Sequence, residues 1–167
     1  MDSPEILNAR QIAQKLNRIS YQIYEHHLGE KEIFIAGIDG NGYLIAKRIT
    51  EILKKISPIQ IKLGKIKINK SSPLAEAPKI DFRESDFKNK SIVLTDDVLN
   101  TGKTLFFALK VFLDTPVKRI STAVLVDRSH TVYPIKIDFV GLSLSTTLQE
   151  HISAELEPKG KEKVVLV

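Results

Sequence analysis

The fold is decided by Ser91-Ile92-Val93-Leu94-Thr95-Asp96-Asp97-Val98-Leu99-Asn100-Thr101-Gly102-Lys103-Thr104. An apolar run at 92–94 predicts a buried strand, which leads to two adjacent carboxylates and a short polar turn. Apolar residues then recur at positions 105, 108, 109 and 112, the spacing of a helix. Unpaired backbone N–H groups at the start of such a helix favour an anion. Acids at the carboxyl end of a strand beside that turn indicate a sugar phosphate site.

This segment resembles the phosphoribosyl-pyrophosphate (PRPP) signature of type I phosphoribosyltransferases, which joins an apolar strand, two acids and a Thr-Gly-x-Thr turn. The resemblance implies that Asp96 and Asp97 are the catalytic acids and lie along the ribose 2- and 3-hydroxyls, directly or through Mg²⁺. The residues implied to hold the 5-phosphate are Leu99, Asn100, Thr101, Gly102, Lys103 and Thr104.

Two other interpretations of this segment fit it less well. An isolated Asp-Asp pair can cap a turn, but capping leaves the two threonines of the turn unexplained. Gly102-Lys103-Thr104 is similar to the end of a nucleotide-triphosphatase loop. That loop needs a glycine where this chain has Asp97, whose carboxylate would face the phosphates, so we reject this interpretation.

The composition is typical of one globular domain. The 167 residues are 43% hydrophobic and 27% charged, which suits a single domain over residues 1–167 with a real core. No apolar run approaches the roughly 20 residues of a membrane span, so we expect a cytoplasmic protein with no membrane partner. Because cysteine is absent, disulfides and a thiol nucleophile are excluded. The net charge of +5 suits phosphorylated substrates, RNA or a solvated lysine-rich surface.

Strand and helix patterns alternate along the chain. Apolar runs predict strands at 32–38, 59–68, 92–94, 119–126, 139–142 and 162–167, and the stretch 149–156 carries only a weak pattern. Helical spacing covers about 43–56 and 105–113. Asp2-Ser3-Pro4-Glu5 predicts the start of a further helix that ends near Gly29. The alternation predicts an α/β domain with a mainly parallel sheet and helices on both faces.

The turn after the first buried strand reads Asp39, Gly40, Asn41 and Gly42. Such a glycine-rich turn serves either as a tight connection or as a backbone cradle for an anion. The resembled family holds pyrophosphate in the loop after this strand, so the resemblance implies that these four residues bind pyrophosphate.

A polar segment without periodicity precedes the PRPP-like strand. The resemblance implies that residues of about 65–90 form a flexible hood, which closes over the active site and excludes water. A simple surface excursion is the alternative. Lys67 or Lys70 is the hood residue that would supply positive charge to the substrate.

The resemblance becomes more specific at the end of the strand predicted at 119–126. Val124-Leu125-Val126-Asp127-Arg128-Ser129-His130, Pro134-Ile135 and Asp138-Phe139-Val140-Gly141 are similar to pyrimidine-operon attenuation regulators with uracil phosphoribosyltransferase activity. This similarity implies that Asp127 and Arg128 lie beside the base; a charged turn after a buried strand is the alternative. The regulators usually carry a Thr-Arg-Gly pyrophosphate loop and a Tyr-Arg-Asp run in the hood, and this chain has neither.

The implied reaction is Mg²⁺-dependent transfer of the 5-phosphoribosyl group of PRPP to a nucleobase, a pyrimidine such as uracil, with release of pyrophosphate. An oxocarbenium-like transition state needs no protein nucleophile, so catalysis would rest on positioning and charge stabilisation. One alternative is a nucleotide-responsive RNA-binding attenuation regulator with little or no turnover, supported only by lysines in 54–55, 62–70 and 88–90. Another is a paralogue that binds PRPP without turnover. The resemblance also implies a homodimer or a higher homo-oligomer.

Overall fold

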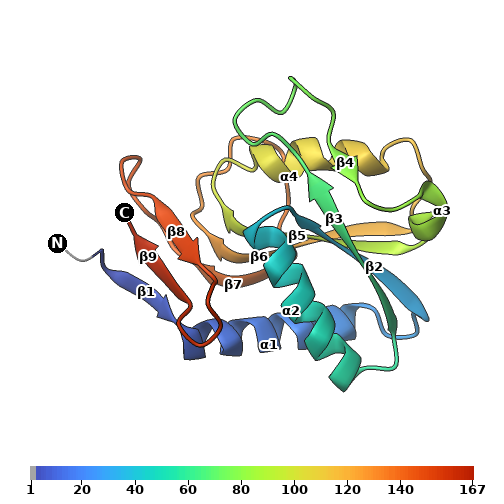
Figure 1. The fold of residues 1–167 in the computed structure, drawn as a ribbon, viewed down its shortest axis with the longest axis horizontal. Coiled ribbons are helices and arrows are strands. Elements are labelled where there is room, and N and C mark those ends of the chain that lie inside the picture. Colours follow the sequence, from blue (N-terminus) through green and yellow to red (C-terminus); the bar gives the residue numbers. More distant parts are fainter. Residues whose placement is uncertain (1–2) are drawn as a thin grey trace.

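The computed structural model describes residues 3–167, which form two sheets and flanking helices (Figure 1). The larger sheet has the strand order β4-β3-β2-β5-β6-β7. Its parallel strands are β2 (Glu32–Ile38), β3 (Gln60–Lys67), β5 (Ser91–Leu99), β6 (Arg119–Asp127) and β7 (Phe139–Ser143). The edge strand β4 (Lys79–Ile80) runs antiparallel to β3. The mainly parallel α/β architecture is therefore confirmed.

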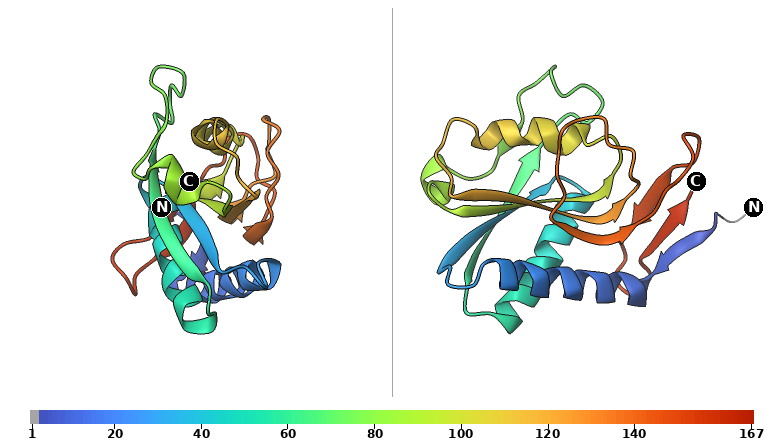
Figure 2. Two further views of the ribbon diagram at one scale, coloured as in Figure 1. Left: turned by 90° about the vertical axis from the view of Figure 1, so that its right-hand side faces the viewer. Right: turned by 180° about the vertical axis from the view of Figure 1, so that it is seen from behind.

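Helices cover both faces of the larger sheet (Figure 2). On one side lie α1 (Ala9–His26) and α2 (Asn41–Ile56); on the other lie α3 (Glu84–Phe87), α4 (Lys103–Ala108) and the 3₁₀ turn η1 (Leu109–Phe112). Alternate residues of β2 enter the two cores: Ile33 and Ile35 join the core beneath α1 and α2, while Phe34 joins the other. Both faces are buried, so the strand reads as a continuous apolar run.

A second sheet joins the two ends of the chain, and the sequence analysis did not predict it. Its order is β1 (Glu5–Asn8), β9 (Lys163–Leu166) and β8 (Ile152–Glu155), all antiparallel. The terminal strand was predicted, but its two partners were not. In Figure 1 this sheet lies beside the end of the larger sheet where β5 and β7 finish.

The prediction of a helix start at 2–5 was wrong, although Asp2 itself lies outside the described residues. Residues 5–8 pair with β9 instead, and α1 begins after Asn8. The Asn8 side chain accepts a hydrogen bond from the Gln11 N–H at 2.9 Å, and Gln11 Oε1 accepts one from the Asn8 N–H at 2.9 Å. This reciprocal capping box satisfies two orphan donors, so the helix starts there.

Only part of the predicted hood at 65–90 protrudes. The connection between β3 and β4 rises beyond the carboxyl ends of the strands (Figure 1). The remainder is anchored on the sheet, because β4 pairs with β3 and the Phe87 side chain of α3 is buried in the core. Within residues 3–167, no helix has the length and apolar character that a membrane span requires.

Close packing of α2 on β5 sets the geometry at the carboxyl end of the sheet. A Cβ atom on Gly42 would lie 2.9 Å from the Thr95 carbonyl oxygen and 3.1 Å from the Asp96 Cα atom. The Thr95 hydroxyl donates a hydrogen bond to the Gly42 carbonyl at 2.8 Å. Glycine at position 42 therefore lets the first turn of α2 lie directly on the acid-bearing strand.

Replacing Gly42 by Ala should reduce the free energy of unfolding by about 1–3 kcal/mol, because the methyl group overpacks backbone that cannot move cheaply. Urea unfolding measures the change. Lys47→Ala, at an exposed position of the same helix, is the control and should change stability by less than about 0.5 kcal/mol. An unchanged midpoint for Gly42→Ala would show that α2 can withdraw from β5 without cost.

Candidate active site

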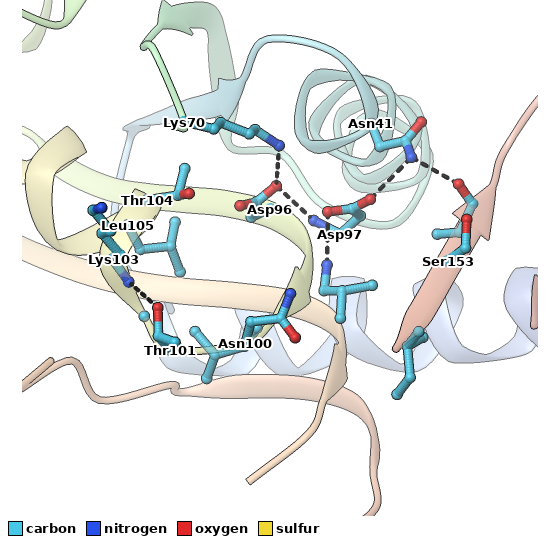
Figure 3. A pocket seen from close by; sticks show the side chains of 15 residues that line it. Asn41, Lys70, Asp96, Asp97, Asn100, Thr101, Lys103, Thr104, Leu105 and Ser153 are labelled. Atoms are coloured by element: carbon cyan, nitrogen blue, oxygen red, sulfur yellow. Dashed lines mark hydrogen bonds and ion pairs between the residues drawn. The ribbon is translucent and has the colours of Figure 1, made fainter. Parts of the chain in front are cut away.

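A cavity of about 390 Å³ opens where β2 and β5 end, beside β8 (Figure 3). It brings together the acid pair, the turn that follows it and two lysines. Its lining residues are Asn41, Lys70, Asp96, Asp97, Val98, Leu99, Asn100, Thr101, Gly102, Lys103, Thr104, Leu105, Ile152, Ser153 and Ala154. All six residues predicted to hold the 5-phosphate are among them, with both predicted catalytic acids.

The two acids lie next to each other in one strand and both line the cavity. Strand β5 continues to Leu99, beyond the apolar run that predicted it, and the two side chains meet different partners. Asp96 is 4% exposed, and its Oδ1 lies 3.8 Å from the Lys70 Nζ. Asp97 points toward α2, where its Oδ2 accepts a hydrogen bond from Asn41 Nδ2 at 2.9 Å. Figure 3 shows the two carboxylates between Lys70 and Asn41.

The surroundings of Asp96 disfavour its charge. Burial and, to a smaller extent, the neighbouring Asp97 carboxylate raise the pKa of Asp96 to about 7, while Lys70 opposes the shift. The lysine ammonium is half exposed, so it compensates the buried carboxylate only in part. The acid pair therefore favours an added cation.

Mg²⁺ fits this donor set only together with ligand oxygens. Among residues 3–167, no cluster of three or more His, Cys, Asp or Glu side chains is arranged to hold a metal ion. Two carboxylates alone suit Mg²⁺, which usually keeps waters and takes its other oxygens from substrate phosphates. Asp96 and Asp97 are the residues that would hold it.

The turn at 99–104, which follows the acids, packs against segment 131–135 on the side away from the cavity. Gly102 has a φ of +83°, and a Cβ atom there would lie 2.5 Å from the Ile135 Cγ2. The Thr101 carbonyl accepts hydrogen bonds from the Val132 and Tyr133 N–H groups at 2.9 and 3.0 Å. The Lys103 N–H donates to the Thr101 hydroxyl at 3.3 Å. Segment 131–135 thus supports the turn, whose other side lines the cavity.

Of the four residues predicted to hold pyrophosphate, only Asn41 lines this cavity. Gly42 is covered by β5, and Gly40 turns the chain at a φ of +93°. The Asp39 carboxylate lies 3.6 Å from the Lys65 Nζ and borders a separate depression beside the hood. Lys67 also lines that depression, so of the two hood candidates only Lys70 reaches the acids.

Asp127 and Arg128, which the resemblance implies to lie beside the base, do not line this cavity, and their role at the base stays a prediction. Arg128 is 5% exposed, and its guanidinium donates hydrogen bonds to surrounding protein groups. Asp127 Oδ1 accepts the Ser129 N–H at 2.7 Å, which shapes the turn after β6. Both side chains are therefore engaged in the scaffold behind the site.

Sequence reasoning missed Ile152, Ser153 and Ala154 of β8, which form one wall of the cavity. The Ala154 carbonyl accepts a hydrogen bond from Asn41 Nδ2 at 2.8 Å, so this wall is tied to α2. The signal that could have found this strand is the short alternation of apolar and polar residues at 152–156, but its place beside the cavity follows only from pairing with β9.

Comparisons with known proteins agree with this geometry. A family model described as phosphoribosyl transferase domain matches residues 2–166. The bifunctional protein PyrR of Pediococcus pentosaceus is 36% identical over 172 residues, covering 98% of this chain and 97% of that protein. The bifunctional protein PyrR of Caldicellulosiruptor bescii is 35% identical over 170 residues, covering 98% and 93%.

Similar solved structures share the fold. The hypoxanthine phosphoribosyltransferase of Trypanosoma cruzi has a TM-score of 0.78 at 12% identity and covers 97% of this chain and 94% of its own. A hypoxanthine-guanine phosphoribosyltransferase from Bacillus anthracis has a TM-score of 0.74 at 16% identity, with coverage of 100% and 97%. At such identities, these matches establish the α/β fold alone.

Replacing Asp96 by Asn should stabilise the metal-free protein by an amount that grows with pH. Because the folded-state pKa is raised from 3.8 to about 7, the folded protein binds more protons than the unfolded chain in that window. Its stability therefore falls as pH rises from about 4 to 7 and levels off above, and the variant escapes this loss. Thermal unfolding between pH 4.5 and 8 measures the difference. Asp114→Asn, which removes an exposed carboxylate elsewhere, controls for net charge; a gain independent of pH would contradict the prediction.

Proposed function

This chain belongs to the phosphoribosyltransferase family, and on that premise we propose that it transfers the 5-phosphoribosyl group of PRPP to a pyrimidine base such as uracil, releasing pyrophosphate. The observation that carries the proposal is that one cavity is lined by both the acid pair and the turn at 99–104. These two features suit the two ends of a ribose 5-phosphate, whose hydroxyls and phosphate need different partners.

The turn is the proposed site of the 5-phosphate. Thr101, Lys103 and Thr104 line the cavity at the start of α4, where backbone N–H groups have no partner within the helix. The rigid support behind Gly102 lets these groups meet an anion without reorganisation.

The acid pair is the proposed site of the ribose hydroxyls and of Mg²⁺. Magnesium bound there would neutralise the buried carboxylates and the pyrophosphate oxygens. In the proposed complex, Asp96 and Asp97 stabilise electrostatically the positive charge that develops on the ribose in an oxocarbenium-like transition state. Asn41 holds Asp97 in place through its hydrogen bond at 2.9 Å.

The choice of a pyrimidine rests on residues 124–141, which resemble pyrimidine-operon attenuation regulators. The curated relatives described as bifunctional protein PyrR support the same choice. PRPP and the base are the proposed partners, and a homo-oligomer is the proposed assembly.

A second candidate is a nucleotide-responsive RNA-binding regulator, favoured by the description of those relatives as bifunctional. Many lysines of the stretches that suggested it are engaged with acids. Lys62 and Lys90 lie 3.9 and 2.9 Å from the Glu32 carboxylate, and Lys65 lies 3.6 Å from Asp39. Paired lysines attract phosphates less, so we rank this function second. RNA affinity that falls steeply with salt and depends on UMP would favour this regulatory function over the enzymatic one.

Replacing Asp97 by Asn should lower pyrophosphate release from PRPP, Mg²⁺ and uracil by about a hundredfold or more, because a charge aimed at the transition state is lost. Pyrophosphate release is measured across a panel of bases, with circular dichroism to verify the fold. Asp114→Asn is the control and should keep full activity. If no base yields pyrophosphate and PRPP with Mg²⁺ fails to raise the melting temperature, the proposed function is wrong.

Lys70→Ala should raise the KM for PRPP about tenfold, because a charged donor at the cavity mouth is removed. Lys67→Ala removes the same charge from the same segment but outside the cavity, so it serves as the matched control. Initial rates at varied PRPP concentration measure both. Equal effects of the two substitutions would show that Lys70 contributes only to the overall positive charge of the hood and makes no specific contact with PRPP.

A further inference from the structure

Arg128 connects the phosphate turn to the loop after β7. Its Nε donates a hydrogen bond to the Thr146 hydroxyl at 2.9 Å, and its Nη2 donates to the carbonyls of Thr147 and Glu150. Its Nη1 donates to Asn100 Oδ1. All three guanidinium nitrogens are thus engaged, and of these partners only Asn100 lines the cavity.

This contact determines which way the Asn100 amide faces. A guanidinium donates and never accepts, so the Asn100 atom that meets it must be the carbonyl oxygen, however the two amide atoms are assigned. The amide nitrogen is then turned away from Arg128. In Figure 3 it lies on the side of Asn100 that is nearer to the acid pair. Among residues 3–167 it donates no hydrogen bond, so the cavity wall offers a free neutral donor.

We propose that Asn100 determines base specificity, with its Nδ2 donating a hydrogen bond to the 4-carbonyl oxygen of the pyrimidine base and Arg128 acting as the positioning residue. This inference rests on the proposed function. The phosphate already has Thr101, Lys103 and Thr104, and the ribose hydroxyls have the acids. In a bound nucleoside monophosphate, the group that remains for Asn100 is the base, and a neutral amide donor suits a neutral carbonyl oxygen.

The arrangement selects an oxo base over an amino base. Uracil presents an oxygen at the position where cytosine presents an amino group, and two donors that face each other leave both unpaired. Because Arg128 holds the amide by its oxygen, Asn100 cannot rotate to accept from cytosine without breaking its contact with the buried Arg128 guanidinium. The specificity therefore depends on a residue that never touches the ligand.

Asn100→Asp tests the donor, because it keeps an oxygen for Arg128 and replaces the free N–H group by an acceptor. Calorimetric binding of UMP is compared with that of ribose 5-phosphate, which has the same phosphate and hydroxyls but no base. We expect the ratio of UMP affinity to ribose 5-phosphate affinity to fall about tenfold or more. Equal losses for both ligands would assign the amide to the phosphate and overturn the inference.

Arg128→Lys tests the positioning role, because a single ammonium cannot hold Asn100, Thr146 and two carbonyls together. The preference for UMP over CMP should fall, while ribose 5-phosphate affinity changes less than twofold. A purely structural role would lower the melting temperature and leave the UMP to CMP ratio unchanged, which would contradict the proposal. If the wild-type protein binds neither PRPP nor ribose 5-phosphate, the proposed function fails and this inference falls with it. If the wild-type protein binds ribose 5-phosphate but shows no preference between UMP and CMP, the inference is wrong and the proposed function stands.

Discussion

Two carboxylates on consecutive residues of β5 line one cavity, and the rest of the site depends on compensating their adjacent charges. Strand β5 keeps its pairing with β6 through Asp96 and beyond, so the backbone that carries both acids stays fixed. Each acid consequently needs its own partner, and the structure supplies Lys70 for Asp96 and Asn41 for Asp97. The hood and α2 are thereby both connected to the strand on which the chemistry depends.

The wall of the cavity at Asn100 is held by polar contacts of the buried Arg128 side chain. Arg128 is 5% exposed and holds segment 146–150 against Asn100. Such a network is stable only when all of its members are satisfied, and this one has acceptors at all three guanidinium nitrogens. The wall beside the phosphate turn is therefore rigid although it consists of loops.

Periodicity in the sequence was enough to place the central strands and the helices that follow them. The apolar run at 32–38 and the helical spacing after Asn41 leave little choice, because both faces of the sheet are buried. The turn at 99–104 was identifiable because its residue types serve one local structure. Strand β8 was missed although Ile152, Ala154 and Leu156 alternate with Ser153 and Glu155, because this alternation is short and the strand is placed by pairing with β9. The start of α1 was missed although Asn8 and Gln11 carried a capping signal, because the earlier Ser-Pro-Glu sequence carried a similar one.

The role of Arg128 was beyond sequence reasoning for a different reason. A charged residue after a buried strand predicts an exposed turn, and the acceptors that make its burial favourable are carbonyls 19 and 22 residues farther along the chain. Backbone acceptors leave no trace in residue identity.

The orientation of Asp39 also depends on a residue far away in the sequence. Its charge in a pyrophosphate loop would repel the substrate if it faced the cavity. Lys65 on the adjacent strand draws that carboxylate to the other side of the loop, 3.6 Å from its ammonium group. The Asp39 carboxylate therefore lies outside the cavity, and Asn41 is the residue of this loop that meets the acid pair.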